Sequence, residues 1–360
     1  MFDSEKTSAL VWRLRALAAP KVFIFAVLLT LWTSIPDPPG FDEDTFQCIE
    51  FFAGKGELSR TQKLSGKSAV RLDLEYMDAN HKGRNVMNIL TPEGMALAIR
   101  CILRGDPTGF LCHFGLKCST WSTVNVGTSC RSERSSLGNC DHESVRSGNA
   151  MASRVILLAT LVVALGGCFT VEQPGGSFLE YYPRWRDFLR VLDEVGGDGT
   201  VHRVTWHMLH YGGPTPKPHW AVSNSRRISE LHRGKFDHAG WKAKPKSERD
   251  SVKTTIKYQD KQGKDRFKGS SRLRKSEEYP VMFGLKLVEL YEWLVGSCRG
   301  QPSLPPTIPT ALETFQSMGI GDDEESLWSE ASIVEVCKYL RGGTSLLIPP
   351  DFRPFLPRRL

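Results

Sequence analysis

The chain of 360 residues is predicted to be an α/β protein with a doubly wound, mostly parallel sheet. Short apolar segments typical of strands alternate with longer segments whose apolar residues recur at helical spacing. The first strand-like segment ends in a glycine turn, and a polar helix start follows it, as in α/β folds that bind nucleotides. Strands and helices that alternate at this interval favour a parallel sheet with helical crossovers. We also expect a small basic insertion and flexible termini.

The predicted elements follow from local signals along the chain. A helix is expected over 56–64 after the glycine turn, and a strand over 68–74, where apolar residues alternate. Thr91 and Pro92 are typical of a helix start, as N-cap and first helical residue, and predict a helix over 91–103. The remaining expected elements are a strand over 109–114, a polar loop over 115–134, a long apolar helix over 144–165, a strand over 168–171, a helix over 182–195, paired strands over 201–206 and 220–224, and a helix over 279–296.

Length and composition allow one large domain with an insertion, or two domains. Hydrophobic residues make up 40% of the chain, which is ordinary for a globular protein. The nine cysteines have no paired spacing, so free thiols in a reducing compartment are expected and a metal site is not. The predicted parts are an N-terminal apolar segment (1–40), an α/β core (41–230), a basic insertion (231–276), a helix that returns to the core (277–298), and a Pro-rich linker with an acidic tail (299–360).

An apolar run over 22–35 stands near the N-terminus, after Arg13, Arg15 and Lys21. Its length suits a signal-peptide core or a buried helix better than a full membrane span. A targeting segment, a membrane anchor and a packing helix are all compatible with it. The Pro-Asp-Pro-Pro-Gly sequence that follows breaks the chain, so the folded core is expected to begin near Phe41.

The positive charge is concentrated in one part of the chain. The net charge of the protein is +7, and the segment 233–275 holds 15 Lys and Arg residues against 5 Asp and Glu residues. Such a basic, polar stretch is expected to be a flexible loop or arm. It either contacts the phosphates of a nucleic acid or is a solvated insertion without a partner.

The glycine turn reads Glu-Phe-Phe-Ala-Gly-Lys-Gly-Glu-Leu-Ser over 50–59. Glycine lets the backbone approach a ligand, and the following helix N-terminus offers free N–H groups. A dinucleotide fingerprint needs a third glycine where Ser59 stands, and a Walker loop ending at 66–68 needs one where Thr61 stands. Both ligand classes are therefore disfavoured.

The turn resembles the Asp/Glu-x-Phe-Ala-Gly-x-Gly-x-x-Ser element of cytosine-5 DNA methyltransferases, which binds S-adenosylmethionine. The resemblance implies a Rossmann-like methyltransferase fold with this cofactor. An acid after the second strand can hold ribose hydroxyls, although it can also be a solvent-facing strand cap. The residues assigned to the cofactor are Phe52, Ala53, Gly54, Gly56, Asp73, Glu75 and Asn88.

The loop after the strand over 109–114 resembles the Pro-Pro-Cys-x-x-Phe-Ser loop of the same family. Cys118 matches the nucleophile, while Trp121 and Ser122 match the aromatic residue and the serine and are assigned to the substrate. The two prolines are replaced by Leu116 and Lys117, which leaves loop rigidity and catalysis open. Lys117, which stands in place of the second proline, can lower the pKa of the neighbouring Cys118 thiol. An inert loop cysteine is the alternative.

Three further matches follow in the order of the family. Glu172 matches the catalytic glutamate of a Glu-Asn-Val or Glu-Asn-Pro element, with Gln173 in place of asparagine. The sequence Tyr-Gly-Gly-Pro-Thr-Pro-Lys-Pro resembles a turn near the active site, in which Lys217 takes the place of a basic substrate contact. Tyr279 and the following proline resemble the start of a C-terminal helix beside the cofactor pocket. Together the matches span roughly residues 47–296.

The resemblance implies a methyltransferase that acts on carbon 5 of cytosine in DNA, or in RNA, through a covalent adduct of Cys118. Glu172 would donate a hydrogen bond or a proton to ring nitrogen 3, and the target base would be flipped out of its duplex. A nuclear location follows from this function, while association with an organelle or a membrane through 1–36 stays open. The alternatives are a methyltransferase-like nucleic-acid-binding module without turnover, and a different methyl acceptor. The interval 225–278 is too short and polar to predict strong sequence specificity.

Overall fold

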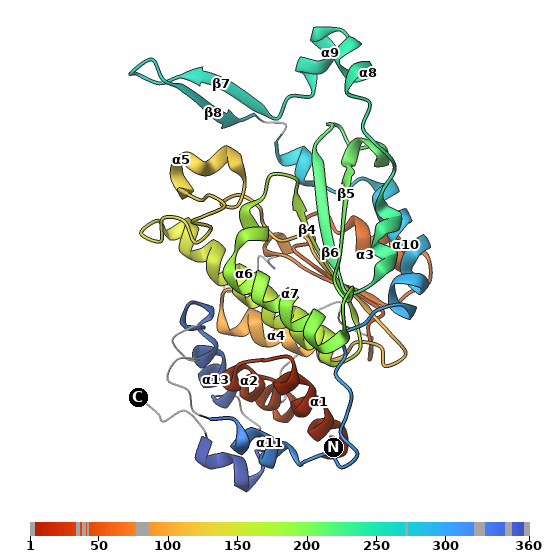
Figure 1. Ribbon diagram of the computed structural model, residues 1–360, viewed down its shortest axis with the longest axis vertical. Coiled ribbons are helices and arrows are strands. Elements are labelled where there is room, and N and C mark those ends of the chain that lie inside the picture. Colours follow the sequence, from red (N-terminus) through yellow and green to blue (C-terminus); the bar gives the residue numbers. More distant parts are fainter. Residues whose placement is uncertain are drawn as a thin grey trace.

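The computed structural model describes residues 4–33, 37, 41, 43–76, 86–270, 273–319, 328–342 and 348–355. It is an α/β protein built around a mixed, mostly parallel sheet of six strands (Figure 1). In chain order the strands are β1 (Cys48–Phe51), β2 (Ala69–Leu72), β3 (Leu111–Phe114), β4 (Cys168–Pro174), β5 (His202–His207) and β6 (Pro218–Ser223).

The strand order is β2-β1-β3-β4-β6-β5. The first four strands of the chain run parallel, with Ile49 of β1 opposite Val70 of β2 and Cys112 of β3. β6 is antiparallel to both of its neighbours, β4 and β5. The chain steps from β1 to β2 on one side and then to β3 on the other, so the winding direction reverses at β1. In open α/β sheets such a reversal opens a crevice at the carboxyl ends of the strands.

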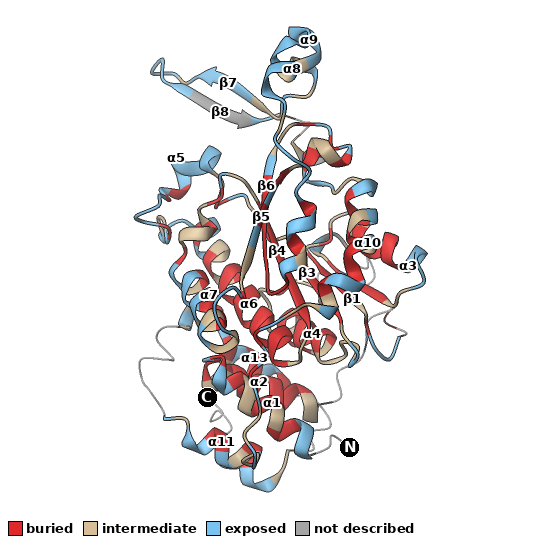
Figure 2. Ribbon diagram, turned by 45° about the vertical axis from the view of Figure 1, so that its right-hand side comes forward, coloured by how far each residue is buried: buried red, intermediate tan, exposed pale blue. Residues whose placement is uncertain are grey.

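Helices pack on both faces of this sheet (Figure 2). On one face, Phe283 and Leu287 of α10 (Val281–Gly296) join a buried cluster with Leu58 of α3 (Glu57–Leu64) and with alternate strand residues such as Leu111. The other face is covered by α4 (Pro92–Leu103), α6 (Glu143–Ala164) and α7 (Pro183–Gly196), whose apolar residues cluster with Cys112 and its equivalents on the other strands. Burial on both faces explains why the strands appear as continuous apolar runs in the sequence.

The two ends of the chain meet in a second helical layer below α4 and α6 (Figure 1). α2 (Lys21–Trp32) packs against α13 (Ile333–Arg341), and α1 (Ser4–Ala16) against α11 (Ala311–Ser317). Residues 23–30 of α2 are all buried. The described part of the apolar N-terminal run is therefore a packing helix. The described parts of both termini differ from the flexible ends that were expected, because their apolar faces cover one another.

Among the described residues, one helix is long and apolar enough to cross a membrane by length and composition. It is α6, and 83% of its apolar window is buried inside the fold. Its neighbours α4 and α7 and the strands β3 and β4 supply that burial. Burial among these elements is what a core helix of a two-sided α/β sheet requires.

The basic insertion carries regular structure that the sequence does not predict. It contains α8 (His238–Ala243), α9 (Lys246–Ser251) and an antiparallel hairpin of β7 (Thr255–Gln259) and β8 (Asp265–Gly269). These elements, which we call the basic arm, project from the body at the end opposite the terminal helices (Figure 1). Ile256 and Tyr258 of β7 are exposed, so the arm depends on backbone pairing more than on a core of its own. The loop after β3 adds one more short helix, α5 (Val126–Ser129).

Candidate functional site

A cavity of about 380 Å³ lies at the carboxyl ends of the parallel strands, where the winding direction reverses. Its walls come from the residues that follow β1, β2 and β3, from the end of β4, from the start of β6, and from residues 276–279 that follow the basic arm. Seven residues predicted from the sequence line it together: Phe52, Ala53, Gly54, Asp73, Cys118, Glu172 and Lys217. Segments that are far apart in the sequence thus meet around one space.

The glycine turn enters this wall with an unusual backbone. Phe52, Gly54 and Gly56 have φ angles of 58°, 53° and 68°, in the left-handed region. The Gly54 N–H donates to Asp73 Oδ2 at 2.8 Å, and the Tyr76 hydroxyl donates to the Gly54 carbonyl at 2.7 Å. A Cβ on Gly54 would meet no atom within 4 Å, so the turn leaves open space on the cavity side.

Gly56 has a different role, because it is buried and is not among the residues that line the cavity. It is the N-cap of α3, and a Cβ there would lie 2.5 Å from the Arg71 guanidinium. Only glycine combines this φ angle with so close an approach. The structure therefore gives Gly56 a part in turning the chain into α3 rather than in the cavity wall.

Glu50 and Ser59, the two ends of the glycine motif, contact each other directly. The Ser59 N–H donates to Glu50 Oε2 at 2.7 Å, so a residue of β1 satisfies one of the free N–H groups in the first turn of α3. Burial raises the pKa of Glu50 to about 7, while the hydrogen bond from Ser59 acts in the opposite direction. This contact orients α3 relative to the sheet and fixes both ends of the turn.

The Cys118 loop is a tight turn that presents the thiol to the cavity. The Cys118 carbonyl accepts hydrogen bonds from the N–H groups of Trp121 at 3.0 Å and Ser122 at 2.9 Å. Burial raises the pKa of the Cys118 thiol, and the charge of Lys217 opposes this rise. Lys117 and Lys217 both line the same cavity as the thiol. The sulfur is therefore a protonated thiol in the resting site, and the Lys217 charge favours its thiolate.

Trp121 and Ser122 are not among the residues that line the cavity. Trp121 is fully buried, the Arg131 guanidinium lies 3.6 Å from its ring centroid, and the Tyr182 ring packs edge-on at 5.2 Å. The Ser122 hydroxyl accepts from the Val124 N–H at 3.3 Å. Both side chains hold the loop from behind, which differs from the substrate contacts predicted for them.

Glu172 is the most enclosed acid of the site. Its Oε1 accepts a short hydrogen bond from His219 Nδ1, and its Oε2 accepts from the Tyr279 hydroxyl at 2.8 Å. Burial on its own would raise the pKa of Glu172, but the charge and hydrogen bond of His219, the hydrogen bond of Tyr279 and the charge of Lys217 together lower it below its usual value. The residue is consequently an ionised carboxylate at neutral pH.

A buried chain of polar groups extends behind Glu172. His113 Nε2 lies 3.0 Å from the Tyr279 oxygen, and His113 Nδ1 lies 2.7 Å from Thr170 Oγ1. Because the Tyr279 proton goes to Glu172, Nε2 must carry the His113 proton and Nδ1 must accept from Thr170. Burial lowers the pKa of His113 to about 4, so the ring is neutral. A Cβ on Gly115 would lie 2.7 Å from the Tyr279 oxygen, so glycine there makes room for this contact.

Gln173 fixes the loop that carries the nucleophile candidate. Its Nε2 donates a short hydrogen bond to the Leu116 carbonyl, and its Oε1 accepts from the Ser177 hydroxyl at 2.8 Å. All three side chains are buried. Gln173 therefore holds the chain two residues before Cys118.

Two further residues, Asn88 and Glu75, are also predicted to bind the cofactor. Asn88 precedes α4, where its side-chain oxygen accepts from the Leu90 N–H at 3.0 Å, and it is not among the residues that line the cavity. Glu75 belongs to the short 3-10 helix Leu74–Tyr76 after β2, and its side chain lies outside the described residues. Two residues of the site, His113 in β3 and His219 in β6, are not predicted from the sequence. A histidine within an apolar strand is the one signal that could have marked them.

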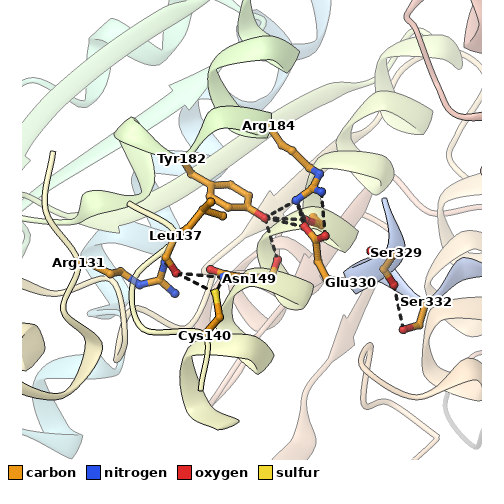
Figure 3. Close-up of polar contacts among 10 residues, drawn as sticks. Arg131, Leu137, Cys140, Asn149, Tyr182, Arg184, Ser329, Glu330 and Ser332 are labelled. Carbon is orange, nitrogen blue, oxygen red and sulfur yellow. Dashed lines mark hydrogen bonds and ion pairs between the residues drawn. The ribbon is translucent and has the colours of Figure 1, made fainter. Parts of the chain in front are cut away.

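Behind the Cys118 loop, a polar cluster ties the C-terminal layer to the core (Figure 3). The Tyr182 hydroxyl lies 2.9 Å from Glu330 Oε1 and 2.8 Å from Arg184 Nη1. Arg184 also donates to Glu330 Oε2 at 2.8 Å. Because the Tyr182 ring also packs on Trp121, the residue that contacts the C-terminal segment is the one that supports the loop of the candidate nucleophile.

Comparison of the chain with known proteins identifies no relative. No protein-family model, no curated protein and no solved structure matches the chain. Among the described residues, no group of three or more His, Cys, Asp or Glu side chains is placed to hold a metal ion.

Proposed function

We propose that the chain is an S-adenosylmethionine-dependent methyltransferase that acts on carbon 5 of cytosine through a covalent Cys118 adduct. The single observation that carries the proposal is the cavity at the carboxyl edge. It is lined by the glycine turn, by Asp73, by Cys118 and by Glu172, each of which follows or ends a different parallel strand. This arrangement supports a doubly wound, Rossmann-like sheet, in which ligands bind where the winding reverses.

The residues present fit S-adenosylmethionine. A Cβ on Gly54 would meet no atom within 4 Å, and the Asp73 carboxylate, which accepts from the Gly54 N–H, lines the same cavity. Phe52 and Ala53 supply apolar surface to the same wall. When bound, this cofactor supplies a methyl group on a positively charged sulfur.

Cys118 and Glu172 would act on the acceptor base from the same cavity. Carbon 5 of cytosine is a poor nucleophile, and addition of a thiolate to carbon 6 makes it enamine-like. Lys117 and Lys217 favour the thiolate of Cys118 as the base enters. Glu172 would face ring nitrogen 3, where negative charge develops, and would have to carry a proton to bind it. Gln173 would keep the loop in place without the two prolines, because it holds the Leu116 carbonyl.

A nucleic acid is the substrate that fits the surroundings of the cavity. Residues 276–279, which follow β8 of the basic arm in the chain, line it, so phosphates bound by the arm would flank the cavity mouth. A base within a duplex would have to be flipped to reach Cys118. A nuclear location is part of this proposal for DNA as the acceptor, and RNA would use the same chemistry.

The test is methyl transfer by Cys118→Ala, with Cys130→Ala as the matched control. Cys130 is an exposed thiol that is not among the residues lining the cavity. We expect Cys118→Ala to lose transfer to cytosine while binding S-adenosylmethionine in a calorimetric titration as the parent does, and Cys130→Ala to keep both. Methyl transfer by Cys118→Ala at the parental rate would exclude the nucleophile assignment.

One alternative function has its own support. Leu116 and Lys117 replace the family prolines, and burial raises the pKa of the Cys118 thiol. Both features favour a methyltransferase-like nucleic-acid-binding module without turnover. DNA that carries 5-fluorocytosine separates the two functions, because it traps a covalent complex only when Cys118 is active and the methyl donor is bound. A protein that binds this DNA tightly and forms no adduct would support the binding module.

A further inference from the structure

The hydrogen bonds around Glu172 leave it without a proton of its own. His219 Nδ1 donates to one oxygen and the Tyr279 hydroxyl to the other, and donors to a carboxylate stabilise its ionised form. Such a carboxylate can accept a hydrogen bond from the base, but it cannot protonate ring nitrogen 3. If the base is protonated at Glu172, the proton must come from a group in contact with it.

The neighbours of Glu172 differ in what they can donate. Burial raises the pKa of the Tyr279 hydroxyl well above its usual value, and the nearby Glu172 charge acts in the same direction. His113 is neutral, and its N–H is used on Tyr279. His219 is the one remaining titratable group in hydrogen-bond contact with Glu172 among the described residues.

The sheet register explains why His219 and Glu172 meet. β4 and β6 are antiparallel, with Glu172 opposite Ala221 and Pro174 opposite His219. Residues two apart on a strand share a face, so Glu172 and His219 are diagonal neighbours on one face. The His219 ring also stacks on Trp206 with centroids 5.9 Å apart, and its Nε2 has no partner in the described part of the chain. The pair is therefore built into the sheet and faces the cavity through both residues.

We infer that His219 is the acid that protonates the acceptor ring, with Glu172 as the relay between them. This inference rests on the proposed function. Cys118 first releases its thiol proton to water. As the sulfur then forms its bond to carbon 6, the proton on His219 Nδ1 moves to Glu172 and from there to ring nitrogen 3. The imidazolium of His219 ends as neutral imidazole, and Glu172 ends as a carboxylate. Addition of the sulfur to carbon 6 shifts the double bonds of the ring, so that nitrogen 3 takes the proton and carbon 5 becomes nucleophilic.

The later steps return the pair to its starting state. After methylation, the hydrogen on carbon 5 leaves as a proton to water, and the bond between carbon 6 and sulfur breaks with its electron pair on Cys118. The proton on nitrogen 3 returns through Glu172 to His219. No oxidant or reductant is needed, and the methyl donor is the one named in the proposed function.

The experiment uses the full chain, with His219→Asn as the main variant and His207→Asn as the matched control. Asn keeps an N–H donor near the position of Nδ1 but cannot release its proton, and His207 at the end of β5 has no contact with Glu172 among the hydrogen bonds of the described residues. We expect His219→Asn to lower the single-turnover rate of transfer to cytosine by about 100-fold or more, with unchanged affinity for S-adenosylmethionine. His207→Asn should stay within threefold of the parent.

A second variant, His219→Ala, distinguishes an acid from a packing residue. Added imidazole is expected to restore part of the rate, and substituted imidazoles should restore it in the order of their acidity. A rate for His219→Asn within threefold of the parent, or a rescue that ignores the acidity of the added imidazole, would overturn the inference. A parent protein that binds no S-adenosylmethionine and methylates no cytosine would overturn the proposed function instead, and the inference with it.

Discussion

Ser59 donates its backbone N–H to Glu50 Oε2 at 2.7 Å, so the last residue of the glycine motif is bound to the first. The middle of the motif, Phe52 to Gly54, lines the cavity. The ends of the motif are therefore structural, and its centre is available for a ligand. A buried carboxyl group that caps a helix also makes the stability of this turn sensitive to pH.

Replacing Glu50 with Gln should remove one pH dependence. The pKa of Glu50 is about 7 in the folded protein and about 4.3 in an unfolded chain. The folded state holds the proton more tightly, so Glu50 favours folding below about pH 4.3 and loses this contribution as the pH rises to 7. We expect Glu50→Gln to be more stable than the parent at pH 8 by roughly 4 kcal/mol, measured by urea unfolding. Glu57→Gln, on the surface of α3, should follow the parent.

His113 should give a pH dependence of the opposite sign. Its pKa is about 4 in the folded protein and about 6.5 when unfolded, so its contribution is full above pH 6.5 and is lost as the pH falls to 4. In a Glu50→Gln background, the unfolding free energy should fall by roughly 3 kcal/mol between pH 7 and pH 4. His113→Gln in that background should flatten the curve, and His142→Gln should not. Equal curves for the two histidine variants would contradict the assignment.

Tyr279→Phe removes one hydroxyl and leaves two groups unpaired. Glu172 Oε2 loses its donor, and the His113 N–H loses its acceptor. An unpaired buried polar group costs about 1–3 kcal/mol, so urea unfolding at pH 7 should show a loss in that range. Tyr291→Phe breaks a single hydrogen bond to the Gly109 carbonyl and should cost about 1 kcal/mol. A smaller loss for Tyr279→Phe than for Tyr291→Phe would contradict the buried chain.

Glu330 should hold the C-terminal segment against the core. Its carboxylate accepts from Arg184, Tyr182 and Ser153, and hydrogen bonds to a charged group contribute about 1.5–3 kcal/mol. We expect Glu330→Gln to speed amide hydrogen exchange of α13 by at least tenfold, while β3 and β4 exchange as in the parent. Glu335→Gln, in an exposed pair with Lys338, is the control and should change α13 exchange by less than threefold.

The basic arm should set the salt dependence of nucleic-acid binding. Each phosphate contact contributes about 0.9 to the slope of log K against log salt for duplex DNA. Replacing Lys261 and Lys264, in the turn between β7 and β8, with Gln should reduce that slope by up to about 2 in fluorescence anisotropy titrations. The control is Lys63→Gln, at an exposed residue of α3, which should leave the slope unchanged. Binding without salt dependence would remove the arm from the proposed interface.

The core of the fold was predictable because each of its elements has a local signal. Thr91 caps α4 with its side chain on the Gly94 N–H as expected, and the helix over 144–165 forms as α6 over nearly the same residues. The terminal layer was not predictable in the same way. Whether the apolar run becomes α2 on α13, or a targeting segment, depends on a partner from the other end of the chain, and no local pattern contains that pairing.

In the candidate site too, residues with a local sequence signal were predictable, and those that depend on tertiary contacts were not. The sequence brings Cys118, Glu172 and the glycine turn forward because they follow predicted strands, and the structure places all three around one cavity. Trp121 lies in the core and not in the cavity wall, which was not predictable because a motif position does not report whether a side chain turns to the ligand or to the core. The contact between His219 and Glu172 could not be predicted from the sequence, since it depends on the register between two antiparallel strands.

The pairing of α2 with α13 has a consequence for synthesis of the protein. The apolar residues of α2 are synthesised well before α13, the helix that covers them. Until α13 is made, the apolar residues of α2 are exposed to solvent, and chaperones that bind short apolar segments are expected to bind them. Closure of this layer would then wait until α13 has been synthesised, so a chain that stalls before α13 should aggregate through α2.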